Sequence, residues 1–153
     1  MELGRGRVVR ESNGVEVEDL IPDDQSILDL MGFGLVVVTG CTHAGILNTL
    51  GYVEGLAGRR PMAVIGGTHL TGRSPEYLAR TIKGLKGYSL SVFSPSHCTG
   101  FKAAAELSAA FPEAFELSYS GRILDFDEVL KKRSSSSLCI KKNDLKGIFI
   151  CVR

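Results

Sequence analysis

The sequence predicts an α/β domain whose mixed sheet carries its helices on one face. The main observation is a unit that occurs three times: a short apolar run, a turn rich in small residues, and a histidine. These units contain all three histidines of the chain, His43, His69 and His97. Successive histidines lie roughly 30 residues apart, which is about the length of one strand–helix unit. A second observation is that the apolar spacing between these units changes from strand-like to helical. Right-handed crossovers then place the connecting helices on one face of the sheet.

The composition is that of an ordinary globular domain. The chain has 153 residues, of which 44% are hydrophobic and 23% charged, enough for one domain with a sizeable core. A net charge of +1 gives no support to binding of nucleic acid or of a membrane surface. No apolar run approaches the length of a membrane span, and residues 1–10 lack the apolar core of a signal peptide. We therefore expect a cytoplasmic protein with neither a nucleic-acid nor a membrane partner.

The first part of the chain predicts a hairpin and two further strands. Residues 8–19 indicate a β-hairpin, because Asn13-Gly14 is a strong two-residue turn signal and the residues after it alternate. Residues 26–30 predict a short strand, which glycines close. Residues 35–39 are apolar without alternation, as is typical of a strand buried on both faces.

The first helix is expected after residue 42. Apolar side chains at positions 46, 47, 50, 53 and 56 fall at helical spacing. We expect Thr42 to cap the amino end of this helix and Gly58 to end it. Pro61 then starts a strand over residues 62–65.

A second helix and its following strand have equally clear signals. Ser74 is a favourable cap, Pro75 fits the first helical position, and Gly87 stops the helix. The next strand is expected over residues 89–93. The alanine-rich stretch 101–111 predicts a third helix.

The end of the chain changes character. We expect two short strands over residues 115–119 and 122–126. Residues 1–127 are assigned to one domain, and residues 128–153 to a linker and tail without an assigned role, because a serine run follows basic residues there. Within the tail, residues 148–152 are expected to form an edge strand or a sticky segment.

The predicted sheet has one uncovered face. Its helices lie on a single side, yet the strands over residues 35–39 and 62–65 are apolar on both sides. We therefore expect another domain, another subunit or a second copy of this chain to cover the other face.

The three histidines suggest a metal site. Each follows the carboxyl end of a predicted strand, and ligand sites of open α/β sheets form at that edge. Imidazole nitrogens suit zinc and iron. We therefore predict that His43, His69 and His97 bind a divalent metal, with zinc as the main candidate and iron or manganese as alternatives.

The four cysteines do not form a zinc-ribbon pattern, because none is paired as Cys-x-x-Cys. Cys41 and Cys98 each lie within two residues of a candidate histidine. Each is either a thiolate ligand or a small buried residue in a tight turn. No structural disulfide is expected in a reducing compartment.

A different interpretation needs no metal. Thr99 and Gly100, together with Thr42, lie where helices are expected to begin, and helix amino ends bind anions. The chain would then be a small-molecule-binding protein with an anion site at Thr99 and Gly100.

Three motifs resemble a known family: the stretches 39–45 (Thr-Gly-Cys-Thr-His-Ala-Gly), 66–70 (Gly-Gly-Thr-His-Leu) and 95–100 (Pro-Ser-His-Cys-Thr-Gly). They are similar to the carboxyl half of metallo-β-lactamase-fold hydrolases. The branch they resemble includes the dihydropterin-methyl-ribofuranosylaminobenzene phosphate synthases, and the resemblance covers about residues 23–126.

The resemblance implies an αββα sandwich of two similar halves with two metals at its edge. His43 would be the first ligand of the carboxyl half and His97 the last. His69 falls near the place where many relatives have a bridging aspartate.

The chain lacks the His-x-His-x-Asp-His loop that the amino half supplies in this family. The resemblance therefore implies the second half of a two-half protein, opened at an internal methionine. It would act on a small molecule, as a metal-dependent hydrolase or pterin-precursor synthase, only when a half with that loop complements it. The expected partner is a separate amino-half chain or a second copy. The alternative is a non-catalytic remnant or binding module that keeps the half fold.

Overall fold

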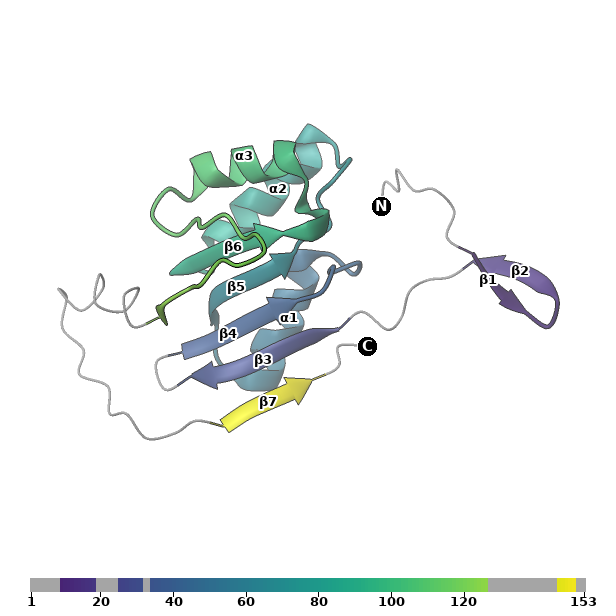
Figure 1. Ribbon diagram of the computed structural model, residues 1–153, viewed down its shortest axis with the longest axis horizontal. Helices are drawn as coiled ribbons and strands as arrows, with labels where there is room; N and C mark the ends of the chain where they lie inside the picture. The colour runs from purple at the N-terminus through teal and green to yellow at the C-terminus, as the bar shows by residue number, and fades with distance from the viewer. Residues whose placement is uncertain (1–8, 19–24, 32–33, 127–145, 151–153) are drawn as a thin grey trace.

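The computed structural model describes residues 9–18, 25–31, 34–126 and 146–150 (Figure 1). Within these residues, five strands form one mixed sheet in the order β6-β5-β4-β3-β7, and two more form a separate hairpin. The sheet consists of β3 (Ser26–Met31), β4 (Gly34–Thr39), β5 (Pro61–Gly67), β6 (Val92–Ser96) and β7 (Lys146–Ile150). The hairpin consists of β1 (Val9–Ser12) and β2 (Val15–Glu18). The helices are α1 (Ile46–Ala57), α2 (Pro75–Lys86) and α3 (Phe101–Ala110), with a short 3-10 helix, η1 (His97–Thr99), just before α3.

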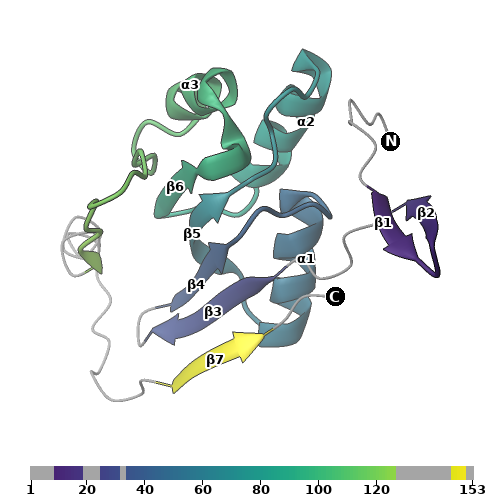
Figure 2. The same ribbon diagram turned by 45° about the vertical axis from the view of Figure 1, so that its right-hand side comes forward.

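The central strands β4, β5 and β6 run parallel, with α1 connecting the first two and α2 the last two. β3 runs antiparallel to β4, and β7 runs antiparallel to β3. Figures 1 and 2 show the three helices over the same face of the sheet. The predicted fold class is confirmed, and the carboxyl ends of β4, β5 and β6 meet at one edge.

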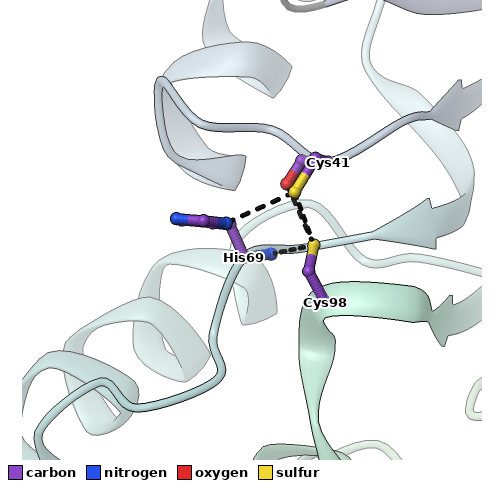
Figure 3. A group of neighbouring side chains, drawn as sticks. All are labelled: Cys41, His69 and Cys98. Atoms are coloured by element: carbon purple, nitrogen blue, oxygen red, sulfur yellow. Dashed lines mark hydrogen bonds between the residues drawn. The ribbon is translucent and has the colours of Figure 1, made fainter. Parts of the chain in front are cut away.

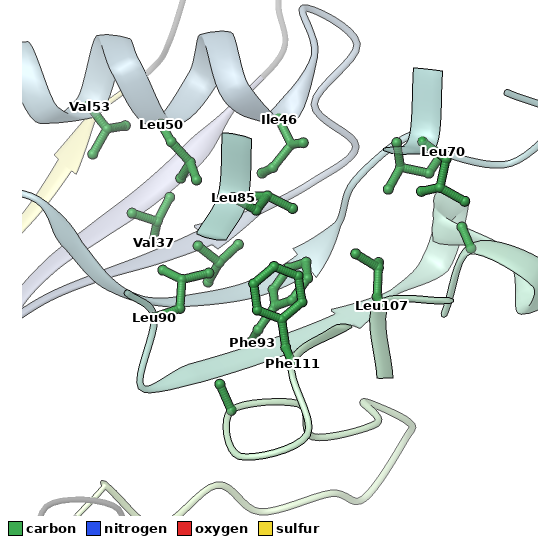
Figure 4. Packing of buried hydrophobic residues seen from close by; sticks show 14 of the residues in the cluster. Val37, Ile46, Leu50, Val53, Leu70, Leu85, Leu90, Phe93, Leu107 and Phe111 are labelled. Carbon is green, nitrogen blue, oxygen red and sulfur yellow. The ribbon is translucent and has the colours of Figure 1, made fainter. Parts of the chain in front are cut away.

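The main hydrophobic core lies between the sheet and the helices (Figure 4). The strand register places Val37, Val64 and Phe93 side by side in one row on the helix face, and all three are fully buried. Burying a large apolar side chain contributes about 1.5–3 kcal/mol. This row therefore holds the helices on the parallel strands, packing against Leu50 and Val53 of α1, Leu85 of α2 and Leu107 of α3.

The opposite face of the sheet has its own smaller cluster. Val36, Ala63 and Val92 are neighbours in the register and are buried there. Leu124 and Phe126 pack against them, so the chain itself covers part of the face that we expected to be covered from outside. Val38 lies on the same face and keeps 36% of its surface exposed.

The prediction of two short strands over residues 115–119 and 122–126 is wrong. Phe115 makes only an isolated bridge to Phe93. The reason is that two of the segment's apolar side chains, Leu124 and Phe126, pack over the sheet face rather than extending the sheet edge.

The first helix begins later than expected. Thr42 is not its cap: α1 starts at Ile46 after Gly45, because Thr42 has a left-handed φ of 57° and its hydroxyl donates to the Gly67 carbonyl. The predicted end is confirmed, since Gly58 follows the helix with a left-handed φ of 63°.

The other local signals gave mixed results. The hairpin turn at Asn13-Gly14 and the Ser74 cap of α2 are confirmed. The strand expected over residues 89–93 starts instead at Val92, because Ser89 has a left-handed φ of 52° and extends the preceding turn. Residues 127–145, which include the expected linker, lie outside the described residues, as do residues 151–152 of the expected edge strand, whose remainder forms part of β7.

Among the described residues, no helix is both long and apolar enough to cross a membrane.

Candidate metal centre

The loops that follow the three parallel strands each hold a non-glycine residue in the left-handed backbone region. Thr42 has φ 57°, His69 has φ 49° and His97 has φ 50°. This conformation costs an L-residue about 1–2 kcal/mol, and such strain gathers at functional sites. The repeated strain at one sheet edge identifies it as the candidate site.

Three metal-binding side chains from these loops lie together (Figure 3). The Sγ atoms of Cys41 and Cys98 are 2.9 Å apart, and Cys41 Sγ lies 3.3 Å from His69 Nδ1. All three ligand atoms lie within 4.8 Å of one another, and each residue is half-buried. The site therefore draws one ligand from each of the three parallel-strand loops.

The loops after β5 and β6 are held together around Cys98. The His69 backbone N–H donates to Cys98 Sγ at 3.1 Å. The carbonyl of Cys98 accepts from the N–H of Thr71 at 3.0 Å and from its hydroxyl at 2.8 Å. The hydroxyls of Thr68 and Thr99 lie 2.9 Å apart in the interior. These contacts fix Cys98 relative to His69.

The loop after β4 is tied to β5 at Gly67. The Thr39 hydroxyl donates to the Gly67 carbonyl at 2.9 Å, and the Thr42 hydroxyl donates to the same oxygen at 3.2 Å. A Cβ at Gly67 would lie 2.3 Å from the Gly40 carbonyl oxygen and 2.8 Å from Cys98 Sγ. The glycine thus allows Cys41 and Cys98 to approach each other.

All three predicted histidines follow carboxyl ends of parallel strands, so they share one edge of the sheet as expected. The structure brings two of them into contact: the rings of His43 and His69 meet edge to face, with centroids 4.8 Å apart. His97 is exposed, in the turn just before Cys98. The assignment of His43, His69 and His97 as metal ligands stays a prediction.

The sequence alone left open whether Cys41 and Cys98 are thiolate ligands or small buried residues. Their proximity to histidines in the sequence was the available signal, and the sheet topology brings both to His69. The donor set of two thiol groups and one imidazole is suited to zinc. The residues present therefore fit a divalent metal of the kind expected from the sequence.

The anion site predicted at Thr99 and Gly100 stays a prediction. The Thr99 hydroxyl is buried and donates to the Ser96 carbonyl at 2.7 Å. Gly100 precedes α3 with φ 76°, and a Cβ there would lie 2.5 Å from the Thr71 hydroxyl oxygen.

A groove lies between the starts of α1 and α2, beside the loop that carries His43. Its wall includes Gly45 and Asn48 from one side and Glu76, Tyr77 and Arg80 from the other. The guanidinium of Arg73 packs over the Tyr77 ring at 5.1 Å, and its Nε donates to the His69 carbonyl. Charged and aromatic groups thus lie next to the candidate metal ligands.

Two curated proteins of Methanocaldococcus jannaschii are similar in sequence to this chain. The first, named 7,8-dihydropterin-6-methyl-4-(beta-D-ribofuranosyl)-aminobenzene-5'-phosphate synthase, is 36% identical over 115 residues, or 74% of this chain and 39% of that protein. The second, an uncharacterized protein, is 38% identical over 96 residues, or 63% of this chain and 35% of that protein. No family model matches the chain.

A solved structure shares the fold. It is the crystal structure of a metal-dependent hydrolase of the β-lactamase superfamily, with a TM-score of 0.72 and 30% sequence identity. The match covers 80% of this chain and 49% of that chain. This chain therefore spans less than half the length of each of these three proteins. The resemblance inferred from the three histidine motifs is confirmed: over most of its length, this chain has the fold and sequence pattern of part of a metallo-β-lactamase-superfamily protein.

Proposed function

We propose that this chain supplies the carboxyl half of a two-half metal centre that acts as a hydrolase or pterin-precursor synthase of the metallo-β-lactamase superfamily. The observation that carries the proposal is the carboxyl-edge site, where three strained loops gather Cys41, His69 and Cys98 and place His43 against His69. Similarity to a metal-dependent hydrolase supports it.

We assign the following roles to this chain's residues. His43, His69 and His97 are the proposed metal ligands, and zinc suits them best, with iron and manganese as alternatives. When bound, a divalent metal lowers the pKa of a coordinated water and polarises the bond to be cleaved. The hydroxyls of Thr39 and Thr42 keep the loop after β4 in place by donating to the Gly67 carbonyl.

The substrate site is proposed in the groove between α1 and α2. Arg80 and Glu76 bring charge to its wall, and Tyr77 adds an aromatic face. This mixture suits a small molecule with both a ring and polar groups. It is also close to the metal ligands, because Gly45 in its wall follows His43 by two residues.

A complete two-metal centre needs more ligands than this sequence offers. The chain contains three histidines in total and no His-x-His-x-Asp-His loop. A catalytic zinc is usually held by three protein ligands, so two metals need about twice as many unless some are shared. We therefore assign the missing ligands to an amino half, carried either by another chain or elsewhere in the same protein.

The test is complementation. This chain would be co-expressed with the amino half of the curated synthase relative, and the purified material would be examined by elemental analysis and by hydrolysis of a panel of simple ester and phosphate-ester substrates. The expected result is a complex that gains divalent metal over this chain alone, toward the two ions of a two-metal site, and that is active, whereas this chain alone is inactive. His97→Asn should lower both metal content and activity of the complex.

An inactive complex with full metal content would favour the non-catalytic binding module. Failure of the two halves to associate, with no gain in metal, would contradict the proposed function.

A further inference from the structure

We propose that Cys41, His69 and Cys98 form a zinc site of their own, with two thiolate ligands that the metallo-β-lactamase resemblance does not assign. The site needs only residues of this chain. It shares His69 with the ligands named under the proposed function, but it needs no residue from another half.

The distances among the three ligand atoms suit a single ion. In tetrahedral coordination, with Zn–S of about 2.3 Å and Zn–N of about 2.0 Å, two sulfurs lie about 3.8 Å apart and a sulfur and a nitrogen about 3.5 Å apart. The observed separations are 3.3 Å from Cys41 Sγ to His69 Nδ1 and 2.9 Å between the sulfurs. All three ligand atoms lie within 4.8 Å of one another. Adjustments of about one ångström, which open the sulfur pair and adjust the third separation, would bring them to tetrahedral spacing.

The surroundings of the ligands resemble those of metal-bound thiolates. Outer hydrogen bonds orient metal ligands and raise affinity. Here the His69 N–H donates to Cys98 Sγ, while the Cys98 carbonyl is held twice by Thr71. The site is thus arranged before any ion binds.

The site also has room for a fourth ligand. Two thiolates and one imidazole leave one position of a tetrahedral zinc for water or another side chain. His43 is a candidate for that position, since its ring meets the His69 ring with centroids 4.8 Å apart. All four residues are half-buried, so an ion can enter without unfolding of the core.

The first experiment uses the full chain, reduced and stripped of metal with a chelator. Cobalt(II), then zinc(II), would be added under anaerobic conditions. We expect one ion per chain and a thiolate-to-cobalt charge-transfer band that zinc abolishes. Cobalt binding without that band, or no binding at all, would overturn the proposal.

The second experiment needs no variant and therefore does not depend on whether substituted chains fold. Zinc-loaded and zinc-free chains would be treated with iodoacetamide, and alkylation at each cysteine measured by mass spectrometry. Zinc should protect Cys41 and Cys98 but leave Cys139 and Cys151 unchanged. Equal protection of all four cysteines, or protection of none, would count against the site.

Matched variants complete the test. Cys41→Ser and Cys98→Ser should each weaken zinc binding by at least the roughly 100-fold that loss of a supporting residue costs. Cys139→Ser and Cys151→Ser should leave it unchanged. Unaltered affinity in a folded Cys98→Ser chain, checked by circular dichroism, would refute the assignment. Because no readout depends on hydrolysis, failure here is distinguishable from failure of the proposed function.

Discussion

At the scale of single residues, the site depends on a position that has no side chain. Gly67 lies where the loops after β4, β5 and β6 converge, and a Cβ there would approach the Gly40 carbonyl oxygen to 2.3 Å. Because this oxygen belongs to the backbone, it can move away from the added Cβ only if the whole loop after β4 shifts. Gly67 therefore controls how closely Cys41 and Cys98 meet.

We expect Gly67→Ala to destabilise the protein by about 1–3 kcal/mol, the usual cost of overpacking a closely packed site, and to weaken zinc binding. Chemical denaturation and zinc titration measure the two effects. Gly55→Ala is the matched control, because Gly55 is exposed in α1 with nothing within 4 Å of an added Cβ. It should raise stability by up to about 1 kcal/mol. A Gly67→Ala chain as stable as the control would contradict the packing argument.

The site was only partly predictable from single residues. Each histidine follows an apolar run and a small-residue turn, so its place at the sheet edge follows from local sequence. The pairing of Cys41 with Cys98 does not, because it depends on how three loops pack across the sheet. The same is true of Thr42: its residue type favours a helix cap, but its hydroxyl binds a carbonyl in β5 instead.

At the scale of elements, α2 is the helix that local chemistry defines best. The Ser74 hydroxyl accepts from the Tyr77 N–H at 3.3 Å, and Pro75 occupies the first turn. The pKa of Glu76 is held below its ordinary value of 4.5, chiefly by a hydrogen bond from its own backbone N–H and next by the Ser74 side chain. Both groups stabilise the exposed amino end of the helix.

Ser74→Ala should therefore lower stability at neutral pH by about 1 kcal/mol and raise the pKa of Glu76. Since the folded pKa is the lower one, the contribution of Glu76 is complete above the unfolded pKa and is lost as pH falls through the folded pKa. An NMR titration of the Glu76 carboxyl, with denaturation at pH 7 and at acid pH, checks both effects. Ser120→Ala, in an exposed turn, is the control. An unchanged Glu76 titration in Ser74→Ala would show that the cap does not act as described.

Elements that turn residues and apolar spacing mark in the sequence were predicted correctly. The segment whose position depends on packing against distant residues was not. The hairpin, the parallel strands and the three helices follow from turn residues and apolar spacing. The prediction of strands over residues 115–126 failed because Leu124 and Phe126 pack over Val36, Ala63 and Val92 on the sheet face instead of pairing within the sheet. Burial across the sheet is a tertiary effect that a local pattern does not contain.

At the scale of the whole molecule, the helices cover one face of the parallel strands β4, β5 and β6, and the other face is covered only in part among the described residues. In an αββα sandwich a second half would pack on the latter, with sheets about 10 Å apart. The uncovered part of this face includes Val38, which remains 36% exposed, whereas Val36 on the same strand is buried.

We expect Val38→Glu to weaken association with a complementing half by about 1 kcal/mol or more, as loss of a buried interface anchor does, because it places a charge in the interface. Light scattering or calorimetry on the purified halves measures this. Leu56→Glu is the control: Leu56 is 48% exposed on α1, on the helix side of the sheet. Equal weakening by both variants, or by neither, would contradict packing through the open face.

The central claim is that Cys41, His69 and Cys98, from the loops after β4, β5 and β6, together hold a zinc ion. X-ray absorption at the zinc edge of the zinc-loaded chain tests it most directly, because it reports the atoms around the ion. The account predicts two sulfur atoms at about 2.3 Å and at least one imidazole nitrogen at about 2.0 Å. A zinc shell of nitrogen and oxygen atoms alone, or a chain that retains no zinc, would contradict it.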